Sequence, residues 1–144
     1  MGNLGQASLE YMVMLGISLT IFAAILYLTT VLISSSTSQI GVDSALRSVE
    51  RIKEAADFIY IHGHPSKTRI NVQVPSNIED ISIQNHVVKF RIYAGLGYTD
   101  IYDVTKGNLT SNLEAICYGG YCREGYYVLN VESTDLGVIN ITVI

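Results

Sequence analysis

The chain has 144 residues, of which 49% are hydrophobic and only 15% are charged, and its formal net charge is −4. This balance excludes a disordered chain and is unusual for a free soluble enzyme. Lys and Arg are scattered along the sequence and Trp is absent. Without a basic stripe, nothing favours nucleic-acid binding.

The apolar residues concentrate near the N-terminus. No formal charge lies between Glu10 and Asp43, and the densest apolar part covers residues 11–33. About 20 such residues suffice for a helix to span a bilayer. The run exceeds the h-region of a cleaved secretory signal, which is about 7–15 residues long, and no small-residue cleavage site follows it. We therefore expect this segment to remain in the mature protein.

One long helix is predicted over residues 6–61, preceded by a short leader of residues 1–5. Residues 6–33 form its apolar part. In residues 40–61, apolar side chains recur at spacings of three and four with charged residues between them, which indicates an amphipathic helix. The apolar stripe comprises Val42, Ala45, Leu46, Val49, Ile52, Ala56 and Ile59. Gly63 and Pro65 predict the end of the helix.

Residues 62–144 are predicted to form a β-rich head. Beyond Pro65 the hydrophobic period changes to two, and about six short strands alternate with turn signals, one of them a tight turn at residues 84–86. No helical pattern separates the strands, so βαβ units are not expected. The expected fold class is α+β, with a long N-terminal hydrophobic helix packed at its C-terminal half on a small antiparallel sheet or sandwich.

A polar stretch with the sequence QASLEY, residues 6–11, lies directly before the apolar run. On physical grounds, Glu10 could lie at a membrane interface or favour the helix start, with Ser8 as its N-cap. The stretch also resembles the Q-x-S-x-E-[FY] signature of the class III signal peptides of archaeal type IV pilins. The leader, residues 1–5, lacks the Lys or Arg that such leaders usually carry.

The resemblance implies a lollipop-shaped subunit that a prepilin peptidase cuts between Gly5 and Gln6. It implies that the helix anchors the precursor in the membrane. An assembly platform and its ATPase would then build the subunits into an extracellular homopolymer for adhesion or surface attachment, with the helix in the filament core. It further implies that Glu10 pairs with the new amine of Gln6 on an adjacent subunit and so sets the axial register. Such pairing suits the high cost of burying a lone carboxylate.

Small residues in the apolar part, namely Gly16, Ala23 and Ala24, would permit close approach between helices. Ordinary transmembrane composition explains them equally well.

Two cysteines, Cys117 and Cys122, flank a Gly-Gly turn, which favours a hairpin disulfide. Free thiols, or half of a metal site completed by His62, His64 and His86, are the alternatives, although zinc needs about four ligands. We expect the disulfide, and no metal or cofactor.

Two N-glycosylation sequons start at Asn108, in an expected loop, and at Asn140, in an expected strand whose alternation points it outward. The resemblance raises the expectation that they are glycosylated.

No phosphate loop, H-E-x-x-H motif or nucleophile elbow is present, so an enzyme is not expected. The leading prediction is a pilin. A minor pilin or an archaellin-type subunit is the alternative within this class. From another class, the chain could be a single-pass membrane protein whose extracellular β domain binds a ligand or an envelope partner.

Overall fold

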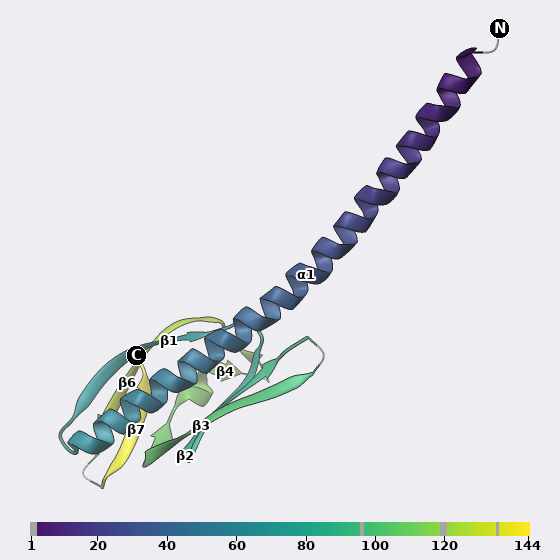
Figure 1. Ribbon diagram of the computed structural model, residues 1–144. Helices are drawn as coiled ribbons and strands as arrows, with labels where there is room; N and C mark the ends of the chain where they lie inside the picture. The colour runs from purple at the N-terminus through teal and green to yellow at the C-terminus, as the bar shows by residue number, and fades with distance from the viewer. Residues whose placement is uncertain (1–2, 96, 119–120, 135) are drawn as a thin grey trace. The chain divides into compact units, whose positions relative to one another are not determined.

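A computed structural model describes residues 3–95, 97–118, 121–134 and 136–144, with side chains from Leu9 onward except those of Tyr118 and Tyr121. The chain is α+β, as predicted, with one long N-terminal helix followed by strands (Figure 1). It divides into two compact units, Met1–Ser36 and Thr37–Ile144. The elements in chain order are α1 (Asn3–His62), β1 (Lys67–Val74), β2 (Ile78–Tyr93), β3 (Tyr98–Ser111), the 3-10 helix η1 (Leu113–Ile116), β4 (Cys117–Tyr118), β5 (Tyr121–Cys122), β6 (Gly125–Ser133) and β7 (Val138–Val143).

The two ends of α1 differ slightly from the expected ones. The helix begins at Asn3, inside the expected leader, and ends at His62, one residue beyond the expected end. Gly63 follows with φ +68°, and its N–H donates to the carbonyl of Ile59 at 3.0 Å. This is the left-handed glycine cap that stops many helices.

The main sheet is mixed, with the strand order β1-β6-β7-β3-β2. Neighbouring strands are antiparallel except β3 and β7, which are parallel over Asn108–Ser111 and Val138–Ile141. The expectation of a purely antiparallel sheet therefore missed this pair. Parallel neighbours need a long crossover connection, and the chain from η1 through β6 supplies it.

The turn predicted at residues 84–86 lies inside β2. Asn85 has φ +56°, and the N–H of Tyr93 donates to the carbonyl of Asn77 at 2.8 Å. A straight 16-residue strand would hold its two ends about 50 Å apart. The strand therefore reverses direction at Asn85, which bears out the predicted tight turn.

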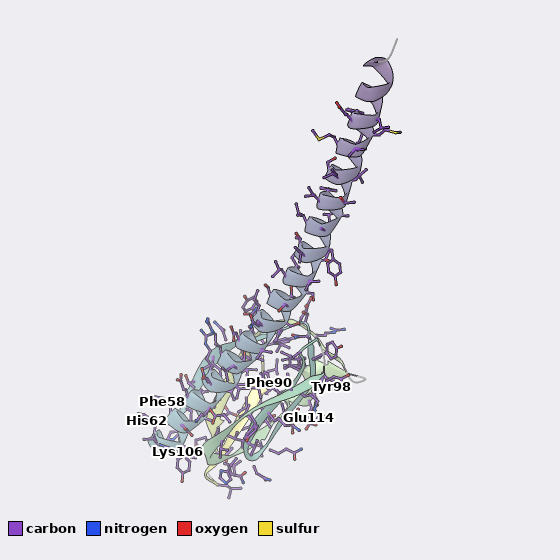
Figure 2. All side chains as sticks on the ribbon, turned by 45° about the vertical axis from the view of Figure 1, so that its right-hand side comes forward. Phe58, His62, Phe90, Tyr98, Lys106 and Glu114 are labelled. Carbon is purple, nitrogen blue, oxygen red and sulfur yellow. A yellow bond between two sulfur atoms is a disulfide. The ribbon has the colours of Figure 1, made fainter. Side chains whose placement is uncertain are left out.

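The core of the unit Thr37–Ile144 lies between α1 and the strands. The predicted stripe on α1 is fully buried at Ala45, Val49, Ile52, Ala56 and Ile59. Val42 is half-buried and Leu46 is exposed, whereas Ser48 and Ala55, which the prediction left out, are buried, so the buried face is displaced from the predicted stripe. On the strand side the core contains Val72, Phe90 (labelled in Figure 2), Leu129, Ile139 and Ile141. The sheet thus covers the apolar stripe of α1, as predicted.

Candidate functional site

The first half of α1 presents an uninterrupted apolar surface. Every side chain from Leu9 to Ser36 is exposed, and among these residues the one formal charge belongs to Glu10. Figure 2 shows these side chains spread around the helix. By length and composition this helix can cross a membrane. So large an apolar surface is rare on soluble monomers, so it requires lipid or other protein around it.

Several hydroxyl groups in this segment bond to carbonyls of the helix itself. Ser18, Thr20, Thr29 and Thr30 each donate to a carbonyl three or four residues earlier, at 2.7–2.9 Å. A polar group in an apolar surrounding is costly unless it is hydrogen-bonded. These four side chains can therefore enter an apolar medium with their hydroxyls already bonded. The sequence analysis did not single out these residues. The general tendency of Ser and Thr inside a helix to donate to a carbonyl of the preceding turn could have indicated them.

The residues of the predicted processing motif lie in the first turns of α1. Gly5 and Gln6 belong to the helix, but their side chains lie outside the described part of the chain. Glu10 is exposed. Because residues four apart lie on one helix face, Gln6 and Glu10 share a face. Their predicted pairing would join two subunits, so the structure of a single chain does not test it.

The small residues of the apolar half lie at the helix surface. A Cβ added at Gly16 would meet no described atom within 4 Å. Ala23 and Ala24 are exposed. Gly16 and Ala23 are seven residues apart, so they lie on one face about two turns apart. That face is sterically open to a neighbouring helix.

The second half of α1 is tied to strand edges by polar side chains. Ser48 Oγ donates to the carbonyl of Gln73 at 2.7 Å, and Arg51 Nη1 donates to the carbonyl of Asn71 at 3.1 Å. At another strand, Asp57 Oδ1 accepts the N–H of Lys106 at 2.8 Å. These contacts satisfy backbone groups that β1 and β3 leave unpaired.

One ion pair also joins α1 to the sheet. Lys53 Nζ lies 2.9 Å from Asp103 Oδ1 and 3.0 Å from Oδ2. The hydrogen bond from Lys53 lowers the pKa of Asp103 below its ordinary value, with burial acting in the opposite direction. The same hydrogen bond raises the pKa of Lys53. Both side chains are about one-third exposed, so the contribution of the pair is screened by solvent.

The predicted disulfide is confirmed. Cys117 and Cys122 are bonded and are partners in the short β4–β5 ladder. Cys122 is buried in the core of the head. The bond therefore closes the β4–β5 ladder, and the burial of Cys122 anchors this ladder in the core, while the glycines of the turn, residues 119 and 120, lie outside the described residues.

The bonded sulfurs are not available as thiolate ligands for a metal. His62 Nδ1 lies 2.8 Å from the carbonyl oxygen of Phe58, and His64 Nδ1 lies 3.0 Å from that of Ser133. Within the described residues, no three His, Cys, Asp or Glu side chains gather as a metal site would require. The alternative of a metal site that uses Cys117 and Cys122 is therefore not supported, because both sulfurs are in the disulfide.

Both sequons lie on strands. Asn108 is exposed but belongs to β3, so the expected loop is wrong there: residues 98–111 continue as a strand and pair with β2 and then β7. Asn140 is half-buried in β7, directly beside Thr110. The alternation of burial places both asparagines on the face of the sheet opposite the core.

Comparison of the chain with known proteins matches no family model and no curated protein.

Proposed function

We propose that this chain is a structural subunit of an extracellular filament of the archaeal type IV pilus kind, made as a precursor and cut before Gln6. The observation that carries the proposal is the first half of α1, where every described side chain from Leu9 to Ser36 is exposed and nearly all are uncharged. Such a surface needs a partner along its whole circumference. A bilayer before assembly and neighbouring helices afterwards would supply that partner.

Three further features are consistent with the filament, and the first of them favours it over a permanent anchor. The QASLEY stretch, residues 6–11, resembles a prepilin processing site. The internally bonded hydroxyls suit the segment to any apolar surrounding, whether lipid or protein. The face with Gly16 and Ala23 is open enough for close helix contact.

In this proposal the unit Thr37–Ile144 forms the outer surface of the filament. The chain meets a prepilin peptidase, an assembly platform and an ATPase on the way, and its own copies in the polymer. The exposed Asn108 is the better placed of the two sequons for glycosylation.

The test is N-terminal sequencing and intact mass measurement of protein from filaments sheared off cells. A chain that starts at Gln6 supports processing and assembly, and extra mass on the head points to glycosylation at Asn108 or Asn140. A chain that starts at Met1 or Gly2 and occurs only in membranes contradicts the proposal. That outcome would favour a membrane-anchored β domain that binds a ligand or an envelope partner.

A further inference from the structure

A groove of about 600 Å³ runs between α1 and the outer edge of β1, within the unit Thr37–Ile144. This volume lies in the range typical of small-molecule sites. Three turns of α1 form one wall, β1 forms the floor, and one residue of β6 closes the side. The lining residues used below are Asp43, Ser44, Arg47, Arg51, Asn71, Gln73 and Tyr126.

Two guanidinium groups share the helix wall. Arg47 and Arg51 are four residues apart, so they lie on one face, and like charges at this spacing destabilise a helix. Neither forms an ion pair with a carboxylate of the described residues. Arg51 Nη1 donates one hydrogen bond to the carbonyl of Asn71 at 3.1 Å, which holds its side chain across the groove. Both groups keep donors for a planar anion, which guanidinium binds bidentately.

The edge of β1 supplies further donors, whereas Ser44 Oγ is buried and therefore not accessible to a ligand. The carbonyls of Asn71 and Gln73 point from the edge of β1 toward α1. Because the N–H and C=O of one strand residue point to the same side, their N–H groups face that edge too. Among the described lining residues, the one carboxylate is that of Asp43.

Tyr126 adds a flat apolar surface. Its side chain is 79% exposed at the side of the groove. An exposed aromatic ring beside neutral amides suits a ligand with one apolar ring face and many hydroxyl groups. A lone phosphate or sulfate ion has no ring and would leave most of the volume empty.

We propose that this groove binds an acidic saccharide. Arg47 and Arg51 hold its carboxylate, the amide groups of Asn71 and Gln73 bond to its hydroxyls, and Tyr126 lies against a ring face. The groove lies wholly inside the unit Thr37–Ile144, so binding does not depend on whether the chain polymerises.

The test is isothermal titration calorimetry on the full chain in detergent micelles. The probes are a trigalacturonate, the neutral trisaccharide maltotriose, and triglutamate as an acidic peptide. We expect trigalacturonate to bind and the other two to bind at least tenfold more weakly. Failure of the wild type to bind trigalacturonate at millimolar concentration, or equal binding of either other probe, would overturn the proposal.

The double variant Arg47→Gln/Arg51→Gln assigns the binding to this groove. Since each guanidinium contributes charge-assisted hydrogen bonds, we expect trigalacturonate affinity to fall roughly tenfold or more. Lys89→Gln removes one positive charge on β2 and serves as the matched control, with a change of about twofold or less. Arg47→Gln alone keeps the Arg51 contact to β1, so it tests the site even if the double variant unfolds. Unchanged affinity in the folded variants would contradict the assignment.

Discussion

The two halves of α1 have the same backbone conformation and opposite surroundings. From Leu9 to Ser36 all described side chains are exposed, and hydroxyls such as those of Thr20 and Thr30 bond to the helix itself. From Thr37 to His62 one apolar stripe is buried, and the polar side chains bond to strands. Secondary structure therefore carries little functional information here. The side chains decide whether a helical segment belongs to a core or needs lipid or other helices around it.

The largest effect is expected at the single carboxylate of the first half. Glu10→Gln keeps the shape of the side chain but removes the charge that would pair with the amine of Gln6 on a neighbouring subunit. The variant would leave the amine of Gln6 buried without its partner. Because a buried, unpaired charge is strongly destabilising, we expect filament yield to fall roughly tenfold or more. Glu54→Gln, at an exposed glutamate of the second half, is the matched control. Filament yield measured by shearing and immunoblotting separates them, and equal yields would contradict the register role.

A second comparison truncates one isoleucine in each half. Ile52 is fully buried, whereas Ile25 is 54% exposed. Ile52→Ala should lower the free energy of unfolding of the head by about 2–5 kcal/mol because it leaves a cavity. Ile25→Ala should leave that free energy within about 0.5 kcal/mol. Chemical denaturation in micelles, followed by tyrosine near-UV signals, measures both, and a similar loss in the two variants would break the distinction.

Two leucines of nearly equal exposure sharpen the contrast. Leu26 is 51% exposed and Leu46 is 45% exposed. In the proposal, however, Leu26 lies in the bilayer before assembly, whereas Leu46 faces water. Leu26→Arg should make the free energy of membrane insertion less favourable by about 3 kcal/mol. Leu46→Arg should leave insertion unchanged. Carbonate extraction of membranes measures the integrated fraction. If Leu26→Arg remained fully integrated and Leu46→Arg did not, the assignment of the two halves would be reversed.

A smaller effect is expected from hydroxyl groups. Ser48 bonds across to β1, so Ser48→Ala leaves the carbonyl of Gln73 without its partner and should cost about 1–2 kcal/mol of head stability. Thr30 bonds only to its own helix, so Thr30→Val should change that stability by less than about 0.5 kcal/mol. Urea denaturation midpoints of the two variants provide the check. A cost for Thr30→Val as large as that for Ser48→Ala would show that the first half also supports the head.

Local patterns in the sequence predicted much of this structure, because each depends on near neighbours. The helix stop at Gly63, the reversal at Asn85 and the disulfide each depend on a few adjacent residues. The periodicity of residues 40–61 located the buried stripe, but it included the exposed Leu46 and left out the buried Ala55, since spacing alone does not show which side of the stripe the sheet covers. The predicted processing at Gln6 would involve contacts with other molecules, which the fold of one chain does not test.

The non-local contacts could not be predicted in the same way. Alternation shows which face of a strand is buried, but not which strand lies beside it, so the parallel pair of β3 and β7 was missed. The ties from Ser48 and Arg51 to β1 span 25 and 20 residues of sequence. Such contacts arise once packing brings a strand edge to the helix, and the sequence shows only polar residues on an amphipathic helix.

The smallest effect is a pH dependence that belongs to the second half of α1. The pKa of Asp103 is lowered from 3.8 by its hydrogen bond with Lys53. The unfolded chain therefore binds this proton more readily than the folded one. The resulting stabilisation is present above the unfolded pKa and is lost as pH falls through the folded pKa. Asp103→Asn should accordingly flatten the stability profile below about pH 5.

The cause of this slope can be isolated with a double-mutant cycle. Lys53→Gln should flatten the same region, because it removes the group that lowers the pKa of Asp103. The double variant should add nothing further, since the two residues act through one contact. Denaturation midpoints measured between about pH 3 and pH 7 test both statements. Independent, additive effects would show that the slope arises elsewhere, and that this charge pair does not couple α1 to β3.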